Sequence, residues 1–365
     1  MKLAPVAEAL DAHGIAPRLI FTGQHPQLEP GDFGLDRFAK FRLDCPGQQD
    51  PHAHVGTVSK ALLPLLGSAD LVIVQGDTSS ALGGALAAQL AGIPIGHVEA
   101  GLRSHDGRRP WPEEEFRIAI DSDATLLFAP TELSVANLRR ERVRGRVFLT
   151  GNTGIDAAMR RLPANPVRSA NDGPPRLLVT CHRRENWGGG IASIAEALRR
   201  LAQENLVCID LILHPNPSVA AQMRLLLGVE PGVALHPPCG HSDLLRRMLH
   251  ADLVLSDSGG IQEEAAALGI PVLVLRERTE RPEAIATGHL TLTGLDAICI
   301  VEAVQRMLSL DGAALADCPY GDGRAASRIA AIVADWLGDR FNAALGGKPD
   351  QALSARTLAE RKLGT

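Results

Sequence analysis

The sequence predicts an α/β protein of two domains, each built on a doubly wound parallel sheet. Short apolar runs rich in β-branched residues alternate with helical patterns along most of the chain, and this alternation is typical of parallel sheets covered by helices. The 365 residues are enough for two domains with full cores. A hydrophobic content of 45% with only 3% aromatic residues also suits an α/β protein.

The first half is expected to form one domain, residues 1–165. We expect its helices at residues 1–12, 55–66, 80–91 and 112–120. Its strands are expected at residues 18–22, 70–74, 93–97, 126–129 and 146–149. Residues 31–50 are rich in glycine, proline and charge, so we expect irregular structure there, beside a binding cleft.

The second half repeats this pattern after a proline-rich segment. Residues 161–176 contain four prolines, and we place the linker there, so that the second domain spans residues 166–322. Its strands are expected at residues 176–180, 207–213, 233–236, 252–255 and 271–275. We expect a helix at 323–340 to pack back on the first domain, and residues 341–365 to form a polar tail.

Composition argues against several classes of partner. The net charge is −5 and no basic stripe interleaved with aromatic residues occurs, so we do not expect nucleic acid to bind. The six cysteines are scattered without a C-x-x-C pair, which predicts reduced thiols in a cytoplasmic protein and no zinc site. The most apolar stretch, residues 81–98, is broken by Gln89 and Pro94, so we expect no membrane span. We also expect no metal and no cofactor.

An anion site is predicted at the turn Asp257-Ser258-Gly259-Gly260. The turn follows one apolar strand and opens a helix, so unpaired N–H groups and the positive end of a helix dipole lie at the carboxyl edge of the sheet. The glycines let a pyrophosphate approach the backbone, and Ser258 either caps the helix or binds the anion. Glu264, about one turn into the helix, is placed to reach a ribose hydroxyl. The alternative is an ordinary capped helix.

Acidic residues follow the strands of the first half. Asp77 and Glu99 each come after a strand, where open α/β sheets bind ligands, so we interpret both as site residues. Glu113, Glu114 and Glu115 open a helix after Trp111-Pro112. For Glu114 and Glu115 we prefer a structural role, because negative charge stabilises a helix N-terminus.

Polar residues also follow the strands of the second half. His182 is flanked by two arginines and a glutamate, and two guanidiniums can hold a phosphate or carboxylate. His214 begins a second polar turn, H-P-N-P. Residues 276–283 place three arginines and three glutamates in a loop. A solvated charge run is the alternative there, but its position beside the S-G-G turn favours a role at the cleft.

Together, an ordered set of motifs resembles one family closely. The set consists of Q-G-D-T-S, H-V-E-A-G-L-R, W-P-E-E, T-G-N-T-x-I-D, H-R-R-E-N, D-S-G-G-I-Q-E-E, E-R-P-E and P-Y-G-D-G. It resembles the bacterial non-hydrolysing UDP-N-acetylglucosamine 2-epimerases from Lys2 to about Leu337. The resemblance implies two Rossmann-like domains facing a central cleft, the fold called GT-B.

The resemblance also implies a reaction and a set of residues. The expected reaction is the reversible conversion of UDP-N-acetylglucosamine to UDP-N-acetylmannosamine by elimination and re-addition of UDP. The implied catalytic residues are Asp77, Glu99, Glu113 and His182. The implied UDP-binding residues are Lys2, His182, Ser258, Gly259, Gly260 and Glu264. A second UDP-N-acetylglucosamine would bind as an activator at Gln24, Gln27, Arg183 and His214. A homodimer is also implied.

One departure from the family concerns the start of the chain. Family members begin with a strand and a G-T-R-P-E turn, whereas this sequence begins at the residue matching the family's lysine, Lys2. We therefore expect the strand in the middle of the first sheet to be missing and its neighbours to lose a partner. Either other residues fill the gap or Met1 is an internal methionine taken as a start, and we favour the second.

Two further functions remain open at this point. A UDP-sugar glycosyltransferase of the same fold would use the S-G-G turn but would need an acceptor, and it would not need Asp77, Glu99 and Glu113 together. A non-catalytic nucleotide-sugar-binding remnant is the other alternative, because of the missing strand. The sequence also leaves open a close relative of the substrate, such as a nucleotide-linked diacetamido-uronic acid.

Overall fold

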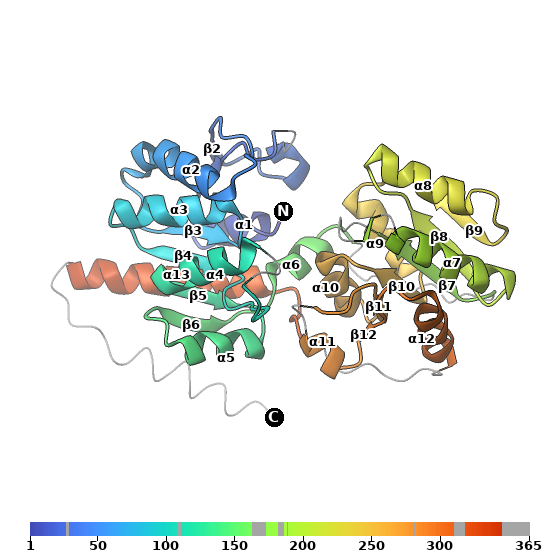
Figure 1. Ribbon diagram of the computed structural model, residues 1–365. Helices are drawn as coiled ribbons and strands as arrows, with labels where there is room; N and C mark the ends of the chain where they lie inside the picture. Colours follow the sequence, from blue (N-terminus) through green and yellow to red (C-terminus); the bar gives the residue numbers. More distant parts are fainter. Residues whose placement is uncertain are drawn as a thin grey trace, which may run out of the picture.

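The chain forms two α/β domains that lie side by side (Figure 1). The structure is a computed structural model, and it describes residues 1–26, 29–107, 111–162, 173–181, 186–187, 189–279, 282–309 and 318–344. Every strand pairing in these ranges is parallel, as the alternation of strands and helices predicts. Within these ranges no helix is long and apolar enough to cross a membrane.

The first domain contains two parallel sheets and the helices that cover them. Its strands are β1 (Arg18–Phe21), β2 (Ala39–Arg42), β3 (Val72–Gln75), β4 (Ile95–Val98), β5 (Leu126–Ala129) and β6 (Arg146–Leu149). Its helices are α1 (Ala4–Ala12), α2 (Pro51–Leu66), α3 (Ser79–Leu90), α4 (Glu113–Asp123) and α5 (Glu132–Glu141), with a 3₁₀ turn, η1 (Pro30–Phe33). Residues 31–50 are therefore not wholly irregular, because they include most of η1 and all of β2.

The sheet of the first domain is divided between β1 and β3. Strands β1 and β2 pair with each other, and β3, β4, β5 and β6 form a separate sheet in that order. The end of β1 is still linked to the start of α3, the helix that follows β3, because the hydroxyls of Thr22 and Ser80 lie 2.8 Å apart. Strands β1 and β3 are thus edge strands, as expected for a sheet without a strand between them.

The second domain has one continuous sheet. Its strands are β7 (Arg176–Thr180), β8 (Cys208–Ile212), β9 (Val233–His236), β10 (Leu253–Ser256), β11 (Val272–Val274) and β12 (Leu290–Leu292), in the order β12-β11-β10-β7-β8-β9. Its helices are α7 (Gly189–Gln203), α8 (Pro217–Leu227), α9 (His241–Leu249), α10 (Gly259–Ala267), α11 (Pro282–Ala286) and α12 (Ala297–Ser309). Leu177 and Leu178 join separate apolar clusters on opposite faces of this sheet, as a doubly wound fold requires.

Two helices connect the domains. Helix α6 (Thr153–Met159) follows β6 and lies between the domains in Figure 1. Helix α13 (Ala325–Ala344) begins two residues later than the expected helix and continues beyond it. Its Ile329 and Val333 pack with Val6 of α1 and Phe128 of β5, so the end of the described chain lies on the first domain. The buried carboxylate of Asp156 in α6 accepts the first backbone N–H groups of α13, at 3.2 and 2.8 Å.

Candidate active site

Asp77 lies in the turn after β3, at the carboxyl edge of the first domain's sheet. Thr78 follows as the N-cap of α3 and accepts the backbone N–H of Ala81 at 3.1 Å, which fixes the turn. The guanidinium of Arg117 in α4 donates to the Asp77 carboxylate. Arg117 is buried and also contacts Glu114 at 3.3 Å. This buried arginine therefore holds the Asp77 carboxylate in place at the end of β3.

Glu99 follows β4 in a backbone conformation that few non-glycine residues adopt, with φ of 71°. The backbone N–H groups of Glu99 and Ala100 both donate to the carbonyl of Phe128 at 3.1 Å, which holds this strained turn against β5. The Glu99 carboxylate accepts the Lys2 ammonium at 2.5 Å and the side-chain amide of Gln75. Its side chain is only 9% exposed. Strain of this kind is concentrated at functional sites.

Three glutamates at the start of α4 have three different environments. The Glu113 Oε2 atom is buried without a partner among the described residues. Glu114 accepts the backbone N–H groups of Ser104 and His105 at 3.0–3.1 Å, so it holds the loop after Glu99. Glu115 is exposed and contacts His52 at 3.0 Å. Glu114 thus lies in the first turn of α4, and its structural role extends to the loop that it holds.

The S-G-G turn links β10 to α10, as the sequence predicts. Ser258 occupies the N-cap position, but its hydroxyl makes no cap hydrogen bond, so its capping role is wrong. A Cβ placed on Gly260 would meet nothing within 4 Å, and its φ is not positive. Neither packing nor backbone conformation therefore requires this glycine. Open space over the first N–H groups of a helix suits an approaching phosphate.

Residues around the turn hold it in place. The hydroxyls of Thr180 and Ser256 lie 2.7 Å apart at the ends of β7 and β10. The buried carboxylate of Asp257 accepts the side-chain amide of Asn186 at 2.7 Å. Glu264 contacts the ring of His241 at 2.8 Å. His241 was not predicted from the sequence, because it is the first residue of α9 and no local motif marks it.

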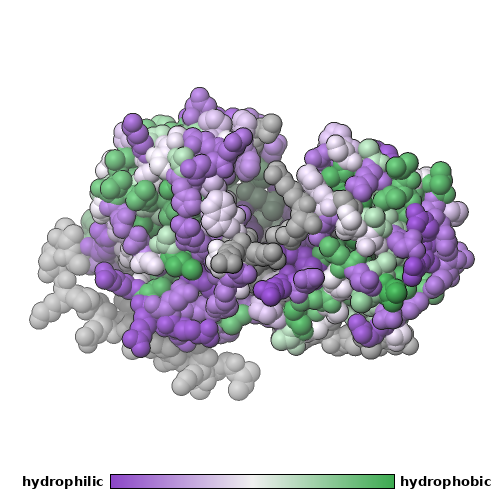
Figure 2. Space-filling view, viewed as in Figure 1, coloured by the Kyte–Doolittle hydropathy of each residue, from purple (hydrophilic) through white to green (hydrophobic). Residues whose placement is uncertain are grey.

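Two contacts connect the first domain, which carries Asp77, Glu99 and Glu113 (the carboxylate side), to the second domain, which carries the S-G-G turn (the phosphate side). The Lys2 ammonium reaches both Glu99 and Glu263 of α10, at 2.5 and 3.3 Å. The hydroxyl of Thr131, the N-cap of α5, donates to Glu283 of α11 at 2.5 Å. Figure 2 shows the surface hollowed between the two domains in this region. The carboxyl edges of both sheets therefore meet at one interdomain cleft.

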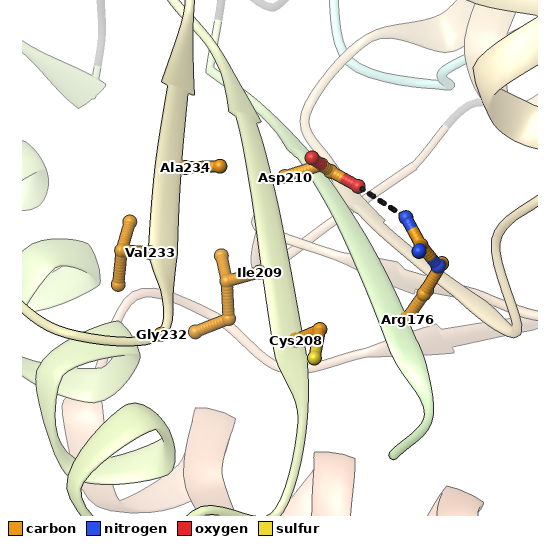
Figure 3. Close-up of a pocket in the computed structure, with 7 residues that line it drawn as sticks. All are labelled: Arg176, Cys208, Ile209, Asp210, Gly232, Val233 and Ala234. Atoms are coloured by element: carbon orange, nitrogen blue, oxygen red, sulfur yellow. Dashed lines mark ion pairs between the residues drawn. The ribbon is translucent and has the colours of Figure 1, made fainter. Parts of the chain in front are cut away.

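A separate pocket lies at the amino ends of β7, β8 and β9 (Figure 3). An ion pair of 3.6 Å between Arg176 and Asp210 lies on one side of it, beside the exposed Cys208. Because this pocket is at the opposite edge of the sheet from the S-G-G turn, it is not part of the interdomain site. No cluster of three His, Cys, Asp or Glu residues in the described ranges is arranged to hold a metal ion.

Comparison with known proteins shows the family of this chain. The family model described as UDP-N-acetylglucosamine 2-epimerase matches residues 8–334. The UDP-N-acetylglucosamine 2-epimerase of Salmonella typhimurium is 42% identical over 356 residues, which cover 90% of this chain and 94% of that protein. This chain belongs to the UDP-N-acetylglucosamine 2-epimerase family.

Solved structures of family members have the same fold. The UDP-GlcNAc 2-epimerase of Neisseria meningitidis bound to UDP-GlcNAc is 34% identical, with a TM-score of 0.81 over 92% of this chain and 96% of that one. The enzyme of Methanocaldococcus jannaschii in complex with UDP-GlcNAc and UDP is 31% identical, with a TM-score of 0.76 over 91% and 95%. The expected GT-B architecture is thus confirmed.

The residues that the 2-epimerase family implies are only partly described. Gln24 lies beside the Asp77 turn, where its side-chain oxygen accepts the Ser80 hydroxyl at 2.6 Å. The His214 ring accepts the backbone N–H of Asn216 at 2.8 Å and packs edge-on against Trp187. Gln27, His182 and Arg183 lie outside the described residues. Their predicted roles therefore stay predictions.

Proposed function

We propose that this protein interconverts UDP-N-acetylglucosamine and UDP-N-acetylmannosamine by inverting carbon 2 of the sugar. Membership of the 2-epimerase family supports the reaction, and relatives of known structure bind UDP-GlcNAc. The observation that carries the proposal is the position of Lys2. Its ammonium contacts Glu99 on the carboxylate side and Glu263 in the helix that begins at the S-G-G turn. A sugar bound there would lie between acid/base groups and a phosphate cradle.

The chemistry requires both sides of this cleft. The hydrogen on carbon 2 is not adjacent to a carbonyl group, so its direct removal is difficult. In the proposed reaction a base takes this hydrogen as a proton while the bond from carbon 1 to UDP breaks, which leaves a double bond between carbons 1 and 2. UDP then adds back to carbon 1, and an acid delivers a proton to the opposite face of carbon 2.

Asp77, Glu99 and Glu113 are the proposed acid/base groups, together with His182. Arg117 donates to the Asp77 carboxylate and holds it at the end of β3, where a base is needed. Glu113 has a buried oxygen without a partner in the described structure, which leaves it available to a ligand. The S-G-G turn and Lys2 would hold the departing UDP, whose negative charge grows as the bond to carbon 1 breaks.

The test is incubation with UDP-N-acetylglucosamine alone. Formation of UDP-N-acetylmannosamine without any acceptor is the expected result, followed by NMR or chromatography. A glycosyltransferase would give no manno sugar without an acceptor, and a binding remnant would give no product at all. A panel of other UDP-sugars in the same assay identifies the preferred substrate.

Three further properties are part of this proposal. A second UDP-N-acetylglucosamine at Gln24, Gln27, Arg183 and His214 would activate the enzyme, which predicts sigmoidal dependence of rate on substrate. The protein would be a homodimer, which light scattering can measure. A cytoplasmic location is supported by the six cysteines, none of which forms a disulfide, and cell fractionation tests it.

A further inference from the structure

A buried histidine joins the two turns that carry Asp77 and Glu99. His97 is the third residue of β4 and is fully buried. Its Nε2 atom lies 2.9 Å from the carbonyl oxygen of Gly76, the residue before Asp77. Its Nδ1 atom lies 2.6 Å from a carboxylate oxygen of Asp121, which is also fully buried on α4. The ring therefore bridges the neighbouring strands β3 and β4 at their carboxyl ends.

Both ring nitrogens of His97 face oxygen atoms. A carbonyl oxygen only accepts hydrogen bonds, so Nε2 carries a proton. Asp121 also accepts the Arg103 guanidinium at 2.8 Å and the backbone N–H of Gly101 at 3.0 Å, which is the pattern of an ionised carboxylate. The ring of His97 therefore connects the carbonyl of Gly76 to a buried carboxylate that three groups hold in place. Arg103 completes the network by a two-point contact with Glu141, at 2.7 and 2.6 Å.

The Asp121 carboxylate binds a residue on each side of Glu99. His97 lies two residues before Glu99 and Gly101 two residues after it, and Asp121 binds both. Arg117, which holds Asp77, lies four residues before Asp121 on α4, so one helix anchors both turns. The spacing between Asp77 and Glu99 is therefore set by buried charged residues of α4 as well as by the sheet.

We propose that His97, held by Asp121, is a positioning residue that fixes Asp77 relative to Glu99. The inference rests on the proposed function, because two groups must act on opposite faces of one carbon atom. A displacement of about 1 Å in such a pair costs about a hundredfold in rate. His97 itself would contact no ligand and would act only through the turns that carry Asp77 and Glu99.

Two substitutions separate the contacts of His97. His97→Asn places an amide where Nδ1 was, so it keeps a donor towards Asp121 but cannot reach Gly76. His97→Gln places an amide where Nε2 was, so it keeps the donor towards Gly76. His289→Gln is the control, because His289 is also buried but lies at the amino end of β12, away from the cleft.

The measurements are kcat, KM and the affinity for UDP, all corrected for the folded fraction. We expect kcat of His97→Asn to fall about a hundredfold, with KM and UDP affinity within about threefold of wild type, since the S-G-G turn that would hold the phosphates lies in the other domain. His97→Gln should recover at least about a tenth of the wild-type rate, and His289→Gln should retain the wild-type rate. The ratio of deuterium exchange into recovered substrate to net inversion should rise in His97→Asn, because the second carboxylate is misplaced.

The outcomes distinguish this inference from the proposed function. If the wild-type protein forms no UDP-N-acetylmannosamine, the function itself is wrong. If the wild type is active and folded His97→Asn has the wild-type kcat and exchange ratio, the positioning role is wrong and the pair is only structural. If one variant does not fold, the exchange ratio of the other variant is compared with that of the wild type. This ratio does not depend on the amount of active enzyme.

Discussion

The two halves of the cleft are built on sheets of different continuity. In the second domain six strands form one ladder, and every residue of its central strand β10 is buried. In the first domain the ladder is divided between β1 and β3, and only Val74 of β3 is buried. The S-G-G turn follows β10, whereas Asp77 follows β3. The phosphate side therefore rests on a continuous sheet, and the carboxylate side begins at a sheet edge.

This difference shows how each side is held in place. The S-G-G turn would bind phosphate through its backbone N–H groups. It therefore needs only the end of a strand, the start of a helix and open space at Gly260. The carboxylate side instead relies on buried charges from α4, with Arg117 on Asp77 and Asp121 on His97. Side-chain networks of this kind rigidify a site only when every member is satisfied. We therefore expect substitutions on the two sides to have different effects.

The largest expected effect is on the rate when Asp77 is changed. Asp77→Asn keeps the shape and removes the charge, so kcat should fall at least about a hundredfold, the lower range of general acid–base contributions. The affinity for UDP, measured by calorimetry, should remain within a few-fold of wild type. Asp123→Asn at the exposed end of α4 is the control and should be neutral. If kcat of Asp77→Asn falls by less than about tenfold, Asp77 is not an acid or base in the reaction.

Hydrogen exchange should reveal the divided sheet directly. The N–H groups of Val72 and Gly76 point to β4, so those of Ile73 and Gln75 point away from it, where no described strand pairs with β3. We expect these two amides to exchange at least about tenfold faster than amides of β4, which is paired on both sides. Equal protection of Ile73 and the β4 amides, measured by NMR, would contradict this comparison.

Much of the fold could be predicted from the sequence, because apolar runs bounded by polar turns mark buried strands. The strands at 126–129, 146–149, 176–180 and 233–236 have the expected bounds. Strand β2 was missed because all four of its residues are exposed and no apolar run marks it. Because each of them follows a strand, Asp77 and Glu99 could also be identified as candidate site residues.

The remainder of the site depends on contacts that no local pattern contains. Arg117 reaches Asp77 across 40 positions, and His97 reaches Asp121 across 24. Glu114 looks like a helix-terminus charge in the sequence, yet its carboxylate turns inward to backbone N–H groups. Local spacing cannot show such partners, because they come from the packing of α4 against the ends of β3 and β4.

A smaller effect is expected on the phosphate side. Gly260→Ala should leave the melting temperature unchanged, since the added Cβ meets nothing within 4 Å. It should weaken UDP binding at least about tenfold, because a lost hydrogen bond to a charged group is worth roughly 1.5–3 kcal/mol. Gly338→Ala in α13 is the control, where the added Cβ is also unopposed. Wild-type UDP affinity in Gly260→Ala would show that the phosphates bind elsewhere.

The smallest expected effect is on the stability of the folded protein at low pH, and it depends on Asp121. Burial would raise the pKa of Asp121, but the facing charges of His97 and Arg103 outweigh it and hold the pKa below its usual range. A lowered pKa in the folded state contributes stability that is present above about pH 4 and is lost as the pH falls further. Asp121→Asn should therefore be less stable near neutral pH and less sensitive to acid in calorimetry. An unchanged acid sensitivity would place the responsible carboxyl elsewhere.

The central claim is that the cleft performs an elimination, with carboxylates on one side and a phosphate cradle on the other. The most direct measurement is turnover of UDP-N-acetylglucosamine in heavy water, followed by NMR of the recovered sugars. We expect deuterium at carbon 2 of UDP-N-acetylmannosamine, since the proton removed by one group exchanges with solvent before another is delivered. Product that retains the original hydrogen at carbon 2 would contradict it.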